Sequence, residues 1–403
     1  MTARRPLRAS LPAQAGVPPF AGKEIIHDLG KPKENGTTHD PIRIGFVTDL
    51  SGPFEYVDGH GGAHAIRMAI EEMGGTVAGR SVELVLGDHR NDEEEARSVA
   101  QRWCVEDGID MIISGVNSDT SLAITGVAAK HYMPVLVIGA GTSVQTRERS
   151  APSIIQYAYS TVSLATVPAI ALAERGLRRW FYITADYPFG RELQEHGSMA
   201  VESAGGMVVG SVKNPHGAED FTTFVEAARD SGAEVLGLAN GHSELLRAME
   251  ALERLGLKDR MTMVGLLTFI DDIRSMTQEK AAGLYLADSW FWTRDPASRA
   301  WAERFHARLQ RMPSSLMAAD YSAALQYLKA VEAVGGTETD AVMRHLRAAT
   351  LDDMYVTNGR IRDDGTMLHD TYLLRVKEPA RSAGALDFYD LVATVGGEQA
   401  VPR

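Results

Sequence analysis

The sequence predicts an α/β protein built of two doubly wound parallel-sheet lobes, and three observations carry this prediction. Its 403 residues are too many for one small hydrophobic core. Short apolar runs of strand length alternate along the chain with segments whose apolar residues recur at helical spacing. This alternation forms two successive series, and strands alternating with helices of about 10–15 residues favour parallel sheets with helices on both faces.

The first series contains four expected strands with helices between them. Apolar side chains within 63–73 lie at helical spacing, and Gly74 and Gly75 end that helix. The acidic run 93–95 after Asp92 suits the positive end of a helix dipole. The expected strands are 42–48, 81–87, 111–114 and 135–138.

The second series repeats this pattern after about residue 160. Its expected strands are 181–184, 208–212, 235–238 and 261–264, with helices at 191–204, 221–231 and 243–255. Residues 290–350 are mostly helical, including 296–309 and 319–334. Strands return at 372–376 and 389–395, and this short end section must complete one or both of the preceding units.

Composition and charge exclude several classes of function. The longest uninterrupted apolar run, 167–173, is far shorter than the ~18–20 residues that a membrane span needs. A net charge of −12 has the wrong sign for a protein that wraps nucleic acid. Cys104 is the single cysteine, which excludes an internal disulfide and any cysteine-based metal cluster. Its place beside Trp103 on an apolar stripe indicates a buried, inert thiol.

Residues 1–40 are predicted to be an arm outside the fold. They hold five of the 16 prolines, and no hydrophobic periodicity begins before Ile42, which is typical of disorder. Arg4, Arg5 and Arg8 look like the basic start of an export signal, but prolines interrupt the apolar region of ~7–15 residues that has to follow. No export signal is therefore visible, and a natural tail or an upstream start-site artefact is the simpler interpretation.

Motifs of enzyme chemistry are mostly absent, so we expect neither catalysis nor a cofactor. The chain has no G-x-S-x-G nucleophile elbow, no G-x-x-x-x-G-K-[ST] phosphate loop and no H-E-x-x-H zinc helix. The loop 139–141 lacks the third glycine of a dinucleotide-binding fingerprint. His60 and His64 have a spacing that could hold a metal, but the glycines between them favour ordinary surface or first-turn histidines.

Polar loops at the expected carboxyl ends of strands are the best candidates for a binding site. In an open parallel sheet these ends form the ligand crevice, near the point where the strand order switches. The loops 115–118 and 139–143 supply the hydroxyls of Ser118 and Thr142 beside a helix N-terminus, a setting that favours a carboxylate. The same residues could instead serve only as helix caps.

Two loops of the second series carry aromatic and amide side chains. The loop 185–190 contains Tyr187 and Phe189, and the loop 239–242 contains Asn240. Aromatic side chains on exposed loops often form binding surfaces, although Tyr187 or Phe189 could equally pack between the lobes.

The order of these motifs resembles the solute-binding proteins of ABC importers, in the branched-chain amino-acid type with its type I periplasmic binding fold. The similar segments run through 44–54, 79–85, 134–142, 186–190 and 220–222. Segments 237–240, 289–292 and 358–365 look like a subgroup associated with aromatic acids. Each motif alone is loose, whereas their order and spacing over residues 41–395 are specific.

The resemblance implies two lobes joined by three crossovers. The crossovers would fall near 159–161, 287–290 and 351–355. Lobe 1 would then comprise 41–159 plus 290–352, and lobe 2 would comprise 160–289 plus 353–395, with 396–403 as a tail.

The resemblance also implies roles for particular residues. Ser118, Ala140 and Thr142 match the positions that hold the ligand carboxylate in amino-acid-binding members, and Phe189 matches an aromatic that closes over the ligand. The loop that usually supplies a counter-ion for the ligand ammonium has no acid before Asp271, which disfavours a zwitterionic amino acid. The candidate ligand-binding residues are Phe54, Tyr56, Asn117, Ser118, Ala140, Gly141, Thr142, Tyr159, Tyr187, Phe189, Asn240 and Leu267.

We therefore expect the solute-binding component of an ABC importer that closes two lobes over a small carboxylate, an aromatic acid rather than a branched-chain amino acid. The expected partners are this ligand and the membrane permease, with no nucleic acid and no metal, and we expect a monomer. The family implies a periplasmic location. The alternatives are a ligand-sensing regulator of the same fold and a binder of a branched-chain amino acid or amide.

Overall fold

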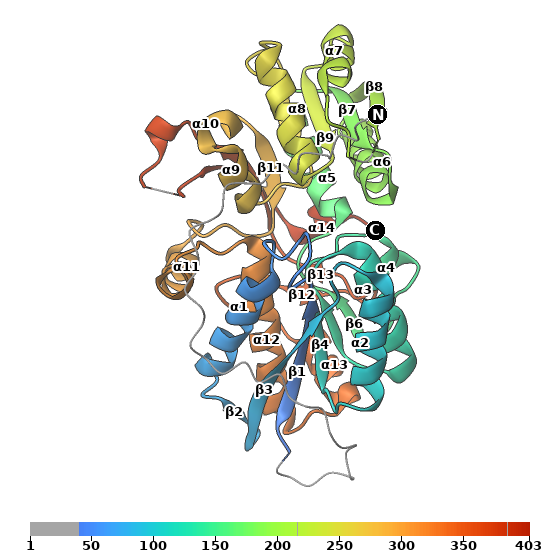
Figure 1. Ribbon diagram of the computed structural model, residues 1–403, viewed down its shortest axis with the longest axis vertical. Helices are drawn as coiled ribbons and strands as arrows, with labels where there is room; N and C mark the ends of the chain where they lie inside the picture. Colours follow the sequence, from blue (N-terminus) through green and yellow to red (C-terminus); the bar gives the residue numbers. More distant parts are fainter. Residues whose placement is uncertain (1–39, 216, 385) are drawn as a thin grey trace, which may run out of the picture.

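The computed structural model describes residues 40–403 except 216 and 385, and it contains two α/β lobes (Figure 1). The expected arm therefore lies outside the described residues, apart from Asp40. The strand order of the first sheet is β2 (Thr76–Val77), β3 (Arg80–Asp88), β1 (Ile42–Thr48), β4 (Met111–Ser114), β5 (Val135–Val137) and β6 (Ile154–Gln156). The strands β3, β1, β4, β5 and β6 run parallel, and the short β2 is antiparallel to β3.

Helices cover both faces of this sheet because successive side chains of a strand point to opposite sides. Phe46 of β1 belongs to a buried cluster that includes residues of α1 (Gly59–Glu72) and α12 (Ser315–Val334). The next residue, Val47, belongs to a second cluster with α2 (Glu93–Val105) and α3 (Ser118–Ala128). The prediction of a doubly wound lobe is confirmed.

The second sheet is mixed but mostly parallel, in agreement with the prediction of parallel-sheet lobes. Its order is β15 (Tyr389–Val395), β14 (Thr371–Val376), β11 (Tyr285–Asp288), β10 (Thr262–Gly265), β9 (Val235–Ala239), β7 (Arg179–Ala185) and β8 (Met207–Asn214). The strands β7 to β11 run parallel to one another, whereas β14 is antiparallel to both of its neighbours, β11 and β15. β14 begins at the same edge of the sheet at which β11 ends, so these two adjacent strands run in opposite directions.

Further elements lie in both lobes and between them, and the helix at Thr339–Ala348 packs against α12. Helices α5 and α6 pack against each other beside the second sheet. These elements are α4 (Val144–Arg147), α5 (Thr161–Ala173), α6 (Pro188–Ser203), α7 (Thr222–Asp230), α8 (His242–Arg254), α9 (Ile270–Met276), α10 (Gln278–Ala281), α11 (Pro296–Leu309), α13 (Thr339–Ala348), β12 (Arg360–Ile361), β13 (Met367–Leu368) and α14 (Gly397–Ala400), with short 3-10 turns at Ala129–His131 and Pro379–Arg381.

The chain passes between the two lobes three times, because α12, which lies between β11 and β14 in the sequence, packs against α1 of the first lobe. Side chains join these passages. After β6, the carbonyl of Ala158 accepts hydrogen bonds from the Tyr355 hydroxyl at 3.3 Å and from His369 Nε2 at 2.7 Å. After β11, Trp290 Nε1 donates to the carbonyl of Met354 at 3.0 Å. Each passage is therefore held by a neighbour that is distant in sequence.

Several elements were not expected from the sequence, among them the strands β6 and β11 and the helices α5 and α14. The strands β6 and β11 have only three and four residues. The expected tail, 396–403, includes α14, and its Ala400 is buried. Within residues 40–403, leaving out 216 and 385, no helix is both long and apolar enough to cross a membrane.

Trp103 gives a direct test of the packing on the first sheet. A Cβ added at Gly45 would lie 2.6 Å from the Trp103 ring, whereas one at Gly126, inside α3, would meet nothing within 4 Å. We expect Gly45→Ala to lower the melting temperature by several degrees, because the indole has to move. The matched control Gly126→Ala should leave it unchanged or raise it slightly, since alanine favours a helix by ~0.5–1 kcal/mol. Equal melting temperatures for the two variants would contradict this packing.

Candidate functional site

The two lobes touch through loops that follow the carboxyl ends of their strands, and we call this set of loops the interlobe region. The loop after β1 reaches α8, where the Tyr56 hydroxyl lies 2.8 Å from His242 Nδ1. The ring of Tyr159, after β6, lies 5.7 Å from the ring of Phe269 on the loop after β10. In both sheets the strand order reverses beside these loops, between β1 and β4 and between β7 and β9. This is where ligands bind in open α/β sheets.

The loop after β4 forms a helix cap. Asn117 Oδ1 accepts a hydrogen bond from the N–H of Thr120 at 3.1 Å, and its Nδ2 donates to Asn91. The sequence left open whether this loop only caps a helix, and the structure shows that Asn117 caps α3. Ser118 is the first residue of α3 and is half-buried, so its hydroxyl lies at the positive end of that helix.

The loop after β5 is fastened to the first passage between the lobes. The carbonyl of Ala140 accepts from Gln156 Nε2, and the carbonyl of Gly141 accepts from the N–H of Thr161 at 2.7 Å. A Cβ at Gly141 would lie 2.6 Å from the Tyr159 ring, so this position requires glycine. The loop is thus held rigidly next to the place where the lobes meet.

A carboxylate of the second lobe occupies the donors of this loop. The Thr142 hydroxyl donates to Glu192 Oε1 at 2.8 Å, and the N–H of Ser143 donates to Glu192 Oε2 at 3.0 Å. The Thr161 hydroxyl donates to the same Oε2 at 3.0 Å. Glu192 was not among the residues expected from the sequence. The available signal was its position three residues after Phe189, which places both residues on one face of α6.

The loops after β7 and β9 carry the aromatic and amide candidates of the second lobe. Tyr187 and Phe189 stack with ring centroids 6.4 Å apart, and burial raises the pKa of Tyr187 to about 12. Asn240 is fully buried after β9, and neither its Oδ1 nor its Nδ2 has a hydrogen-bond partner among the described residues. A buried amide without partners is rare in folded proteins and requires an explanation.

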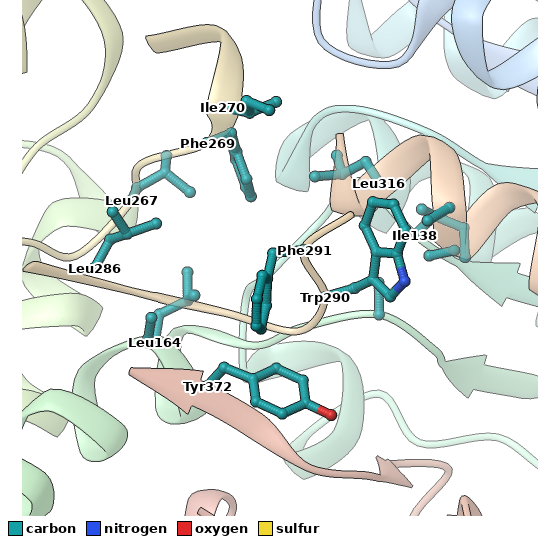
Figure 2. Close-up of a cluster of buried hydrophobic side chains, with 14 of the residues drawn as sticks. Ile138, Leu164, Leu267, Phe269, Ile270, Leu286, Trp290, Phe291, Leu316 and Tyr372 are labelled. Atoms are coloured by element: carbon teal, nitrogen blue, oxygen red, sulfur yellow. The ribbon is translucent and has the colours of Figure 1, made fainter. Parts of the chain in front are cut away.

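The loop after β10 is apolar, and the acids that follow it are already paired. Figure 2 shows Leu267 and Phe269 projecting from this loop toward Phe291 in a buried cluster. Asp272 accepts from the N–H of Phe269 at 2.8 Å through one oxygen, and its other oxygen lies 2.9 Å from His242 Nδ1. Asp271 forms an ion pair of 2.8 Å with Arg311 of the other lobe.

Three buried carboxyl groups were not among the sequence candidates. Burial raises the pKa of Asp58 to about 6, although the Thr48 hydroxyl donates to it at 2.7 Å. Burial likewise raises the pKa of Asp288, at the end of β11, to about 7. Asp320 on α12 is fully buried, and burial together with the nearby Asp58 raises its pKa well above the usual range.

The two histidines and the cysteine that were considered for metal or thiol chemistry occupy ordinary exposed or packed positions. His60 is exposed in the first turn of α1, as expected, whereas His64 is buried and lies against the ring of Phe305. Burial raises the pKa of the half-buried Cys104 to about 11. Across the part of the chain that the structure describes, no three His, Cys, Asp or Glu side chains are grouped to hold a metal ion.

Two α/β lobes that meet through the carboxyl-end loops of their strands define a two-lobe ligand-binding protein, and comparisons with known proteins agree. A family model described as periplasmic binding protein matches residues 41–385. A crystal structure of a periplasmic binding protein from Burkholderia mallei is 43% identical, with a TM-score of 0.83, and the match covers 90% of this chain and 96% of that one.

Two further relatives carry more specific names. A branched-chain amino acid ABC transporter periplasmic ligand-binding protein from Burkholderia xenovorans is 31% identical, with a TM-score of 0.87 and coverage of 90% of this chain and 97% of that one. A Leu/Ile/Val-binding protein homolog from Brucella suis is 24% identical over 85% of this chain and 88% of its own length. The chain therefore belongs to the periplasmic binding protein family, among the ABC-transporter solute-binding proteins of the branched-chain amino-acid type. This family consists of substrate-binding transporter components, not enzymes.

Asp288 makes the stability of the protein depend on pH in a predictable direction. Its pKa is about 7 in the folded chain against an ordinary value of 3.8, so the folded state keeps a proton that the unfolded state loses between these values. The wild-type protein should lose stability as pH rises through this window. We expect the melting temperature of Asp288→Asn, relative to wild type, to be several degrees higher at pH 8 than at pH 5. A difference that does not change with pH would contradict a protonated Asp288.

Proposed function

We propose that this protein binds a small aromatic carboxylate between its lobes and delivers it to the permease of an ABC importer. The observation that carries the choice of ligand is the apolar loop after β10. Members of the family that bind amino acids are expected to place an acid on this loop for the ligand ammonium, and here the loop presents Leu267 and Phe269 instead.

The acids nearest to that loop do not replace the missing counter-ion. Asp271 and Asp272 are engaged by Arg311, by His242 and by the backbone of their own helix. A ligand ammonium buried beside Leu267 would lack a partner, and an unpaired buried charge costs several kcal/mol. A ligand with a carboxylate at one end and an apolar body avoids this cost.

The opposite side of the interlobe region is suited to the carboxylate end of such a ligand. The Thr142 hydroxyl and the Ser143 N–H already bind one carboxylate, that of Glu192, with distances of 2.8 and 3.0 Å. Ser118 adds a hydroxyl at the N-terminus of α3, where the helix dipole favours an anion. The ligand ring would then extend toward Phe189, Leu267 and the amide of Asn240.

The remaining parts of the proposal follow from family membership. We propose a periplasmic location, a membrane permease as the protein partner and a monomeric chain. We also propose the lobe limits expected from the sequence, with lobe 1 as 41–159 plus 290–352 and lobe 2 as 160–289 plus 353–395.

A thermal-shift and calorimetric comparison of ligands tests the proposed specificity. Benzoate and cinnamate should raise the melting temperature, because ligand binding stabilises the folded state by mass action. Leucine at the same concentration should raise it less, because its ammonium has no counter-ion on the loop after β10. Strong stabilisation by leucine with none by the aromatic acids would overturn the ligand assignment.

Asn240 provides a test in which stability and binding change in opposite directions. We expect Asn240→Leu to melt at the same temperature as wild type or higher, because a buried amide without partners is replaced by an apolar group of similar size. The same variant should bind 4-hydroxybenzoate about tenfold more weakly in calorimetry, because the ring hydroxyl loses its hydrogen bond to the amide, whereas benzoate, whose ring has no polar group, should bind about as well as to wild type. A variant that melts lower and binds 4-hydroxybenzoate normally would show that the amide has only a structural role.

A further inference from the structure

The contact between Glu192 and the loop after β5 joins the two lobes at the proposed carboxylate position. Four donor groups contact the two oxygens of Glu192: the Thr142 hydroxyl at 2.8 Å, the Ser143 N–H at 3.0 Å, the Thr161 hydroxyl at 3.0 Å and the Ser143 hydroxyl at 3.3 Å. Thr142 and Ser143 follow a strand of the first sheet, whereas Glu192 lies on α6 beside the second. The contact therefore forms only when the lobes are close together.

These donors cannot serve Glu192 and a ligand at the same time. A threonine hydroxyl has one proton and donates one hydrogen bond, and a backbone N–H donates one as well. A ligand carboxylate at Thr142 would also lie beside a second negative charge in a largely buried setting, where like charges repel strongly. Either Glu192 leaves this loop or the carboxylate does not bind there.

The imidazole of His196 does not remove this conflict. His196, one helical turn further along α6, places Nε2 3.3 Å from Ser143 Oγ. Burial, and then the charge of Arg147, lower the pKa of His196, so this ring is neutral at neutral pH. It supplies no positive charge that would let two carboxylates share the loop.

We propose that Glu192 is a specificity-determining residue: an internal anion that holds the donors of the β5 loop in the ligand-free protein and that a ligand carboxylate has to displace. This inference rests on the proposed function, because it assumes that the ligand carboxylate uses Thr142. Displacement requires a strong acceptor, so Glu192 selects anions over neutral analogues. It also lowers the affinity of every ligand by the free energy of its own contacts.

Benzoate titration of charge variants tests this role. Glu192→Ala should bind benzoate about threefold to tenfold more tightly than wild type, because the competing anion is gone. Glu192→Gln, which keeps the size and one acceptor oxygen, should lie between the two. The matched control is Glu195→Ala, an exposed acid on the same helix, which should leave the affinity unchanged. Unchanged or weaker benzoate binding by Glu192→Ala would overturn the proposal.

Small-angle scattering of the ligand-free protein separates this proposal from the proposed function. Loss of an interlobe contact should increase the radius of gyration of Glu192→Ala and also of Thr142→Val, which removes the same hydrogen bond from the other lobe. Glu195→Ala should match wild type. If no variant binds benzoate but Glu192→Ala and Thr142→Val expand equally, the ligand assignment fails and the interlobe contact stands. If neither expands, Glu192 does not hold the lobes together, and the proposal fails even where benzoate binds.

Discussion

The proposed site depends on one constraint: the carboxyl ends of the strands in one sheet face the carboxyl ends of the strands in the other. Parallel strands place all their carboxyl-end loops on one edge of a sheet, and here the edges of two sheets meet. The loops after β1, β5 and β6 consequently touch α8, α6 and the loop after β10. The polar groups of each loop therefore find their partners, or fail to find them, across the junction between the lobes.

This junction contains both satisfied and unsatisfied polar groups, and the difference supports the proposed position of the ligand. Asp271, Asp272 and Glu192 are bound by cations, by donors of the opposite lobe or by the backbone. Asn240 is fully buried but has no partner among the described residues. A polar group that is costly to bury is retained where a bound molecule completes its hydrogen bonds. The apolar loop beside it explains why the ligand body is expected to be uncharged.

Much of the fold could be predicted from local sequence, whereas the partners across the junction could not. The pair Gly74-Gly75 predicted the C-terminal limit of α1 closely, although the helix begins four residues earlier than expected, and Asp92 lies at the start of α2 as expected. The short β6 and β11 left no periodic signal, and the antiparallel direction of β14 depends on how the chain returns from the other lobe. The sequence identified Thr142 as a polar group on the right loop. It could not show that Glu192, fifty positions later, would bind it, because that pairing depends on the relative position of two lobes.

A crystal structure determined with benzoate would test the central claim most directly. The account predicts electron density between the lobes, with the carboxylate within hydrogen-bond distance of Thr142 and Ser118, the ring beside Leu267 and Phe189, and the Glu192 side chain moved away from the loop after β5. Density for benzoate elsewhere on the molecule would contradict it. So would a carboxylate bound between the lobes while Glu192 keeps its hydrogen bond to Thr142.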